Sequence, residues 1–344
     1  MAILLLDGCG HYGTADIKRK WSSSYPSDFP SGTFSISSVN SRRSSSRHVL
    51  VGSSGAWLQK AIPGGGLSAL TIGLATRQSA LGALELQFVD AAGVQVSVRC
   101  NPDGSFEALR AGITSLGVSV PGCVVASGWH YVEVHVEISA SAGAVSVSID
   151  GGDAALELAG VNTKGSTSGA VTAMRIKHAG LCSGSLAFTD LYIAGNDPFR
   201  GDCRVDTYFP AADGSVSEWG SSYPSAHYQA VDEQSTINCD TDYVYASQED
   251  KRDFYDHSGA GTFSANSVHA VAVSICLRKL GETSLKVRPG LYVSGAAYYY
   301  GSSETPTADY LIRQAVWGEN PHTSASWTDE EVRELEIGIM STTG

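Results

Sequence analysis

Hydrophobic and polar residues alternate along most of the chain with a period of two, which is the pattern of half-buried β-strands. From His130 to Ile138, valine or isoleucine occupies every second position from Val132 onwards, and aromatic, acidic and histidine residues occupy the others. Val145 to Ile149 alternates in the same way, and Asp150 is followed by two glycines that suit a turn. This stretch predicts a hairpin with one buried face and one face exposed to solvent.

The same pattern recurs at short intervals. Leu84 to Phe88 alternates with polar residues, Asp90 to Gly93 can turn the chain, and Val94 to Val98 returns before a second turn at Asn101 to Gly104. Short strands at this spacing are typical of β-sandwiches and barrels. No long helical period interrupts them, so the pattern predicts an all-β protein of antiparallel sheets.

One short helix is expected near the C-terminal end. Thr328 can act as its N-cap, with Glu331 at the position that completes a capping box. We expect the helix to end by Leu335 and a final strand to run from Glu336 to Met340.

The chain of 344 residues is longer than most single hydrophobic cores, so two domains are expected. The turn-forming residues near 195–202 separate an apparent closing strand, Phe188 to Ala194, from a new one that begins at Arg204. We therefore predict two tandem antiparallel β-sandwich domains, residues 1–197 and 198–344.

The formal net charge of −12 argues against nucleic acid as a partner, because an acidic surface repels phosphate. Arg42, Arg43 and Arg47 form a small basic cluster within a serine-rich stretch, which is expected to be a solvated loop. No apolar run is long enough for a membrane-spanning helix, and the first residues suit a strand better than a signal peptide. The seven cysteines lack the spacing of a zinc site or a disulfide framework. We therefore expect them to be reduced residues that pack in the interior of a protein made in the cytosol.

The hairpin from Gly128 to Gly151 resembles the central hairpin of concanavalin A-like, laminin-G-like jelly rolls, and Phe188 to Ile193 is similar to their closing strand. The stretch from Gly201 to Glu233 resembles the junction between such a jelly roll and a second β domain in structural proteins of tailed bacteriophages. Asn320 to Thr323 and Trp327-Thr328 are also similar.

This resemblance implies a jelly roll followed by a second β-sandwich in a part of the virion. That part would be a tail fibre, a tail-tip or neck component, or a capsid decoration. Its partners would be other virion proteins, and it would form a trimer or a ring on the outer surface of a particle assembled in the host cytoplasm. We expect no enzymatic activity and no required cofactor.

A glycoside hydrolase is the distant alternative. Some jelly-roll hydrolases carry two catalytic glutamates on one strand with an aspartate between them, and Glu133 and Glu137 match those positions. Retaining hydrolysis needs carboxyls ~5–5.5 Å apart, whereas residues i and i+4 lie ~13 Å apart along a strand. His135 stands in place of the aspartate, and could instead form a metal site with both glutamates.

Calcium is a further candidate ligand, since laminin-G-like domains often bind it at the rim of the sandwich. Asp150 and Asp153, or Asp240 and Asp242, could supply hard oxygen ligands. Asp-Gly turns also occur without any ion.

Binding of host surface glycans is the main alternative to a purely structural role, because sugar sites combine exposed aromatic side chains with polar groups. The candidate contacts to a glycan or a protein partner are Trp57, Trp219, Tyr298, Tyr299 and Tyr300. Strand alternation predicts that Tyr299 faces away from its two neighbours.

Overall fold

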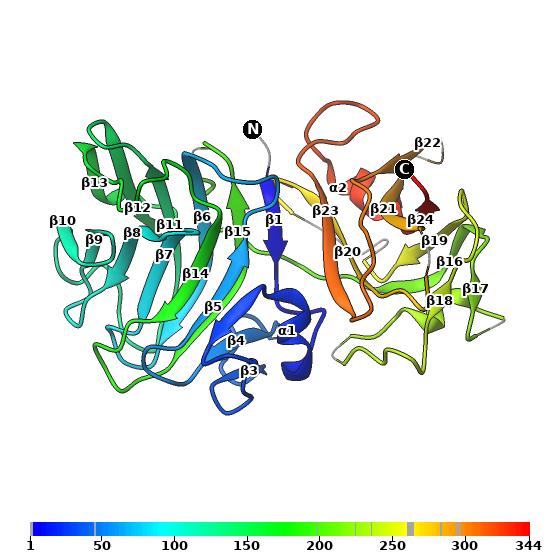
Figure 1. The fold of residues 1–344 in the computed structure, drawn as a ribbon, viewed down its shortest axis with the longest axis horizontal. Helices are drawn as coiled ribbons and strands as arrows, with labels where there is room; N and C mark the ends of the chain where they lie inside the picture. The colour runs from blue at the N-terminus through cyan, green and yellow to red at the C-terminus, as the bar shows by residue number, and fades with distance from the viewer. Residues whose placement is uncertain are drawn as a thin grey trace. The chain divides into compact units, whose positions relative to one another are not determined.

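The computed structural model describes residues 3–44, 46–197, 199–223, 225–234, 236–259, 265–282, 284–293, 295 and 297–344. The chain divides into two compact units, Met1–Asp206 and Thr207–Gly344. Both are all-β and antiparallel, as the period-two pattern predicted (Figure 1).

Unit 1 is a jelly roll of two antiparallel sheets. The eight-stranded sheet has the order β13-β12-β11-β6-β15-β4-β3, with β1 also paired to β15. Its strands are β1 (Ile3–Asp7), β3 (Phe34–Ser37), β4 (His48–Val51), β6 (Ala69–Gln78), β11 (Trp129–Glu137), β12 (Gly143–Ile149), β13 (Ala154–Val161) and β15 (Leu186–Ala194). The predicted hairpin is confirmed as β11 and β12, with Val134 opposite Val147.

The seven-stranded sheet has the order β10-β9-β8-β7-β14-β5-β2. Its strands are β2 (Ser23–Tyr25), β5 (Trp57–Ala61), β7 (Leu84–Asp90), β8 (Gly93–Cys100), β9 (Phe106–Arg110), β10 (Thr114–Val118) and β14 (Ala173–His178). The fully buried side chains of Val134 and Ile72 come from one sheet, and those of Phe88 and Ile176 come from the other. Alternation thus gives each sheet an apolar inner face, and these faces form the core. A 3₁₀ turn (Thr14–Asp16) and helix α1 (Ile17–Lys20) lie between β1 and β2.

Unit 2 is a smaller β-sandwich. Its five-stranded sheet has the order β16-β19-β24-β21-β22, from β16 (Pro210–Ser217), β19 (Arg252–His257), β21 (Lys286–Val293), β22 (Ala297–Tyr300) and β24 (Glu336–Thr342). The ribbon of β20 (Val271–Leu277) and β23 (Leu311–Trp317) supplies a second layer, and β17 (Gly220–Ser221) pairs with β18 (Val244–Tyr245). The core joins Val273 of β20 to Leu291 and Val293 of β21 and to Trp327.

The predicted C-terminal helix is confirmed. Helix α2 runs from Asp329 to Glu334, and Thr328 and Glu331 form both hydrogen bonds of the capping box. Val332 and Leu335 pack into the core of unit 2, and β24 follows directly. A 3₁₀ turn (His227–Ala230) is the other helical element of this unit among the described residues. No helix in the described part of the chain is long and apolar enough to cross a membrane.

Candidate functional site

The outer face of the eight-stranded sheet carries Glu133, His135 and Glu137 of β11. We expected this face to be exposed, and at Glu133 that expectation was wrong, because this residue is only 1% exposed. Its carboxylate accepts hydrogen bonds from Tyr192 Oη at 2.5 Å and from the backbone N–H groups of Arg200 and Gly201 at 2.6 and 3.0 Å. Glu133 therefore holds the segment that follows β15.

Gly73 allows Tyr192 to reach Glu133. In the sheet, Gly73 of β6 lies between Glu133 of β11 and Tyr192 of β15. A Cβ atom on Gly73 would lie 2.2 Å from Cε1 of Tyr192, so only glycine leaves room for the ring. The ring crosses β6, and its hydroxyl donates to the carboxylate.

Burial shifts the pKa of this carboxyl. Desolvation raises the pKa of Glu133 above its ordinary value, although the hydrogen bonds from Tyr192, Arg200 and Gly201 oppose the shift. Glu137 differs, because its side chain is 46% exposed and approaches His135 Nε2 at 3.5 Å. The two glutamates therefore lie in different environments, one covered by the chain and one open to solvent.

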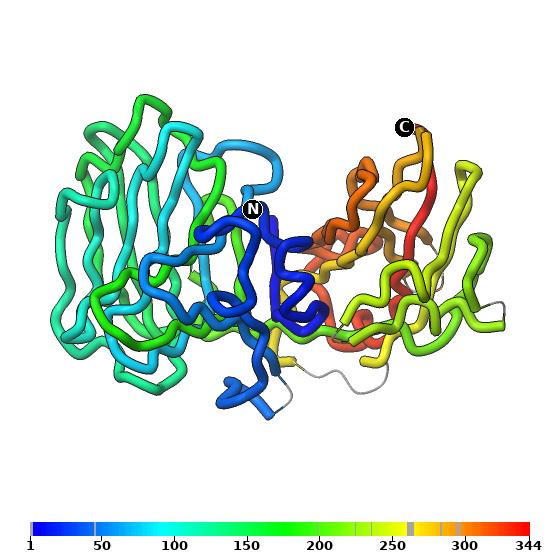
Figure 2. Tube along the Cα trace, turned by 60° about the horizontal axis from the view of Figure 1, so that its bottom comes forward, coloured from blue at the N-terminus to red at the C-terminus, as the bar shows by residue number. Residues whose placement is uncertain are grey.

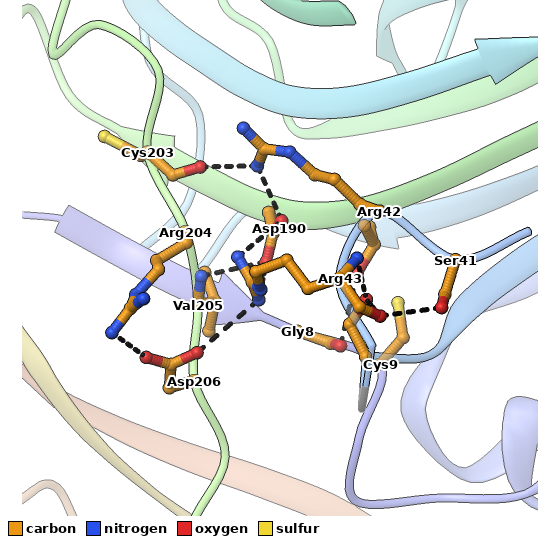
Figure 3. A network of polar contacts seen from close by, with 12 residues as sticks. Gly8, Cys9, Ser41, Arg42, Arg43, Asp190, Cys203, Arg204, Val205 and Asp206 are labelled. Carbon is orange, nitrogen blue, oxygen red and sulfur yellow. Dashed lines mark hydrogen bonds and ion pairs between the residues drawn. The ribbon is translucent and has the colours of Figure 1, made fainter. Parts of the chain in front are cut away.

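Residues 199–206, which we call the exit segment, are fixed to unit 1 by a second carboxylate. Asp190 is fully buried and accepts hydrogen bonds from Arg42 Nη1 at 2.7 Å, Arg43 Nη2 at 3.0 Å and the backbone N–H of Val205 at 2.9 Å. Arg42 also donates to the carbonyl of Cys203 at 2.7 Å. Figure 3 shows Arg42 and Arg43 converging on Asp190, and Figure 2 follows the segment in green.

This network explains why unit 1 extends to Asp206, past the boundary that we expected after residue 197. It also shows that the prediction of a solvated loop for Arg42 and Arg43 was wrong, since both guanidinium groups pair with a buried acid. A signal was present in the sequence: Asp190 is the charged residue in a closing strand that is mostly apolar. It lies at an irregularity in the register of β15 and has φ = 51°.

A pocket of about 330 Å³ lies beside Glu133 on the same face, lined by His135, Ser146, Asn196, Asp197 and Phe199. Thr71 Oγ1 contacts His135 Nδ1 at 3.0 Å and donates to the carbonyl of Asp197 at 2.5 Å. An aromatic ring, an imidazole, an amide and a hydroxyl thus surround one open space. Sequence reasoning did not assign Asn196 or Phe199, because both follow the last strand of the sheet.

Trp57 lies on the outer face of the seven-stranded sheet. Its ring stacks on Tyr25 with centroids 6.4 Å apart, and the guanidinium of Arg175 lies 4.4 Å above it. Tyr25 is 59% exposed, so this group is open to a ligand or a partner. Trp219 is in unit 2 and donates from Nε1 to the carbonyl of Lys251 at 3.0 Å.

The three consecutive tyrosines lie on β22 in unit 2. Tyr298 and Tyr300 stack with centroids 6.4 Å apart on the outer face of the five-stranded sheet. Tyr299 points the other way, packs against the core of unit 2 and contacts His322 Nδ1 at 2.9 Å. The predicted alternation is confirmed. The structure also adds Tyr292, which sequence reasoning did not assign and which stacks on Tyr298 at 4.6 Å.

The aspartates considered for calcium have other partners. Asp150 accepts the backbone N–H of Tyr131 at 2.7 Å and contacts His130 Nδ1 at 2.8 Å, whereas Asp153 is exposed. Asp240 pairs with Arg278 and accepts the hydroxyl of Tyr310 at 2.9 Å, and Asp242 accepts the amide of Asn238 at 3.0 Å. Among the described residues, no group of three or more His, Cys, Asp or Glu side chains could hold a metal ion.

All seven cysteines are free thiols. Cys9 and Cys100 are buried, and desolvation raises the pKa of both. A raised pKa keeps these two thiols protonated and unreactive at neutral pH.

No protein-family model matches the chain, and no curated protein sequence matches it. Solved structures share a weak similarity. The glycoside hydrolase family 131 catalytic domain from Coprinopsis cinerea is 11% identical, with a TM-score of 0.34, over 51% of this chain and 82% of that domain. The VIP36 exoplasmic/lumenal domain in its Ca²⁺/mannose-bound form is 8% identical, with a TM-score of 0.32, over 46% of this chain and 81% of that domain.

The CBM2 module of the evolved Dit of Lactobacillus casei BL23 phage J-1 is also similar, at 10% identity and a TM-score of 0.31, over 40% of this chain and 68% of that one. At this level the three similarities carry no assignment of function. The jelly-roll assignment of unit 1 rests on its own two antiparallel sheets.

Proposed function

We propose that this chain is a non-enzymatic structural protein of a tailed-bacteriophage virion. It would contact neighbouring virion proteins through its sheet faces and loops. The assignment to a virion is supported by two resemblances to phage structural proteins, that of the Gly128–Gly151 hairpin and that of the 201–233 junction. The burial of Glu133 under the exit segment supports the absence of enzymatic activity, and the proposal depends mainly on this observation.

The geometry of β11 opposes hydrolysis. A retaining mechanism needs a nucleophile and an acid on either side of one exposed glycosidic bond. Glu133 is covered by Arg200 and Gly201 of the chain itself, so no substrate reaches it in this conformation. Glu137 is left without a second carboxylate on β11.

The virion assignment is tested on purified particles. Mass spectrometry should detect the chain at a stoichiometry that fits a ring or a trimer, and labelled antibodies should bind the outer surface of the particle. A symmetric assembly is expected because most oligomers are homo-oligomers with closed symmetry. Absence of the chain from particles that were washed free of lysate would overturn the assignment.

Glycan binding is a second candidate, favoured by the pocket of about 330 Å³ beside Glu133. Phe199 can stack on a sugar ring, and Asn196 and Ser146 can bond to its hydroxyls. On a glycan array, Phe199→Ala and Asn196→Ala should each weaken any signal that this pocket produces. Val120→Ala, an exposed change elsewhere in unit 1, is the matched control. Wild-type and variant signals of equal strength would rule the pocket out.

A further inference from the structure

The outer face of the five-stranded sheet of unit 2 carries aromatic residues that its core does not use. The core lies on the opposite face, where Leu291, Val293 and Tyr299 point. Phe254, Tyr292, Tyr298 and Tyr300 occupy the outer face, and we call them the aromatic cluster. Phe254 is fully buried, whereas the three tyrosines are partly exposed and can meet a ligand.

Two glycines form the floor of the cluster. Gly290 of β21 and Gly338 of β24 are paired across the sheet. A Cβ atom on Gly338 would lie 2.5 Å from Cγ of Phe254, and one on Gly290 would lie 2.9 Å from its Cζ. The ring of Phe254 therefore lies across two strands. Tyr298 packs on it edge to face at 4.9 Å, and Tyr300 at 6.3 Å.

Two cations complete the surface. The guanidinium of Arg252 lies 4.9 Å from the ring centroid of Tyr298, and that of Arg288 lies 5.3 Å from that of Tyr300. Arg288 Nε donates to the carbonyl of Gly301, but no ion pair between described residues includes either arginine. This is notable in a chain with a net charge of −12, where carboxylates are plentiful.

The nearby carboxylates make other contacts. Glu218 accepts the backbone N–H of Arg252 at 2.9 Å, and Glu336 accepts both the N–H and the hydroxyl of Ser215 at 2.8 Å. Tyr300 Oη is buried and has no hydrogen-bond partner in the described part of the chain. The surface thus offers guanidinium donors and partly exposed tyrosine rings.

We propose that the aromatic cluster, together with Arg252 and Arg288, binds a saccharide that carries a carboxylate. The tyrosine rings stack on the apolar face of the sugar, and the guanidinium groups pair with its carboxylate, as planar arginine donors do. This inference rests on the proposal that the chain binds glycans. It places the sugar on a different surface from the Phe199 pocket.

The size of the surface favours a sugar over a protein. The cluster and the two arginines belong to β19, β21 and β22, with β24 between β19 and β21. Four strands span about 15 Å, which is the length of a short oligosaccharide, whereas a stable protein interface needs about 800 Å² on each partner. Mixed aromatic and polar groups within that span suit a small ligand.

The test uses the full chain on an array of uronic acid and sialic acid glycans, each beside its carboxyl-reduced form. Wild type should bind acidic glycans and prefer them to the reduced forms. The double variant Arg252→Gln/Arg288→Gln should bind acidic glycans at least about tenfold more weakly, and should lose the preference for them over the reduced forms. Tyr298→Ala should weaken the binding of both the acidic and the reduced glycans, and Tyr298→Phe should retain most of it. Lys279→Gln removes another cation of unit 2 and should change nothing.

Each contrary result has its own meaning. Equal binding of acidic and reduced glycans, or full binding by the double variant with native circular dichroism, overturns the inference. If Phe199→Ala removes the signal while the unit 2 variants keep it, the pocket is the glycan site and the inference fails alone. Silence across the array rejects both glycan sites and leaves the particle assay to decide the structural role.

Discussion

The backbone N–H of Arg200 donates a hydrogen bond to the buried carboxylate of Glu133 at 2.6 Å. This contact gives Glu133 a role in holding the chain together. It also sets apart two glutamates that look equivalent in the sequence.

Glu133→Gln should therefore loosen the exit segment. Glutamine has one acceptor oxygen for the three donors of Tyr192, Arg200 and Gly201. Its NH₂ group would then face another donor. The loss should be about 1–3 kcal/mol of the unfolding free energy of unit 1. Urea unfolding measures it, and limited proteolysis should cut faster within 199–206. Glu137→Gln, at an exposed position, is the control and should behave as wild type. Equal stability of the two variants would contradict this role.

Asp190→Asn should cost more. It leaves Arg42 and Arg43 facing a neutral amide where a buried carboxylate stood, and breaking a buried pair by removing one partner costs about 3–5 kcal/mol. Arg99→Gln breaks a pair with Glu107 that is only partly buried, which should cost about 1 kcal/mol or less. Thermal unfolding of both variants checks the difference, and similar melting temperatures would refute it.

Gly73→Ala tests the route by which Tyr192 reaches Glu133. The added methyl would lie 2.2 Å from the ring, so either the ring or the strand must move. Overpacking of this kind costs about 1–3 kcal/mol. Gly169→Ala is the control, because nothing lies within 4 Å of its Cβ position. In the Tyr192→Ala background the cost of Gly73→Ala should disappear. A cost that persists there would show that the ring is not the obstacle.

Buried histidines predict acid sensitivity. Burial and the charge of Arg77 lower the pKa of His48 from 6.5 to about 4, and burial lowers that of His11 to about 3. Below pH 6.5 the unfolded chain takes up these protons and the folded chain does not. The stability from the neutral rings is therefore complete above pH 6.5 and is lost as the pH falls toward 4.

The raised pKa of Glu133 acts in the opposite direction, so the measurement compares two proteins. His48→Phe keeps a ring against Trp129 and removes the titrating group. Its unfolding free energy should fall less than that of wild type between pH 7 and pH 4.5. A parallel fall in both proteins would show that His48 does not contribute.

Calcium should not stabilise the chain. The carboxylates of Asp150 and Asp240 already bond to groups of the protein, and the described residues offer no cluster of acidic ligands. Adding millimolar calcium, or a chelator, should leave the melting temperature unchanged. A rise with calcium that Asp150→Asn or Asp240→Asn removes would identify an ion site.

The sequence predicted the strands that alternate clearly, since period-two patterning reports which face is buried. It also predicted the capped helix at Thr328, because a capping box is a local signal. The roles of Glu133 and Asp190 depend on residues far away in the chain. Glu133 meets Arg200, 67 positions later, and Arg42 meets Asp190, 148 positions later. No local pattern records such contacts, so the alternation alone assigned Glu133 to the solvent.

The same limit applies to the aromatic cluster of unit 2. The tyrosines at 298 and 300 were visible as candidates in the sequence, but Phe254 and Arg252 come from a strand more than forty residues earlier. Only the pairing of β19 with β24, of β24 with β21 and of β21 with β22 places them on one face.

Both units are completed by their last strands. In unit 1, β15 lies between β6 and β4 and also pairs with β1, so Ile3 finds its partner Ala194 only after nearly the whole unit has been made. In unit 2, β24 lies between β19 and β21. On the ribosome, neither sheet can close until its final segment has emerged. Until then, unpaired edges are open to premature association, and such long-range closure folds slowly.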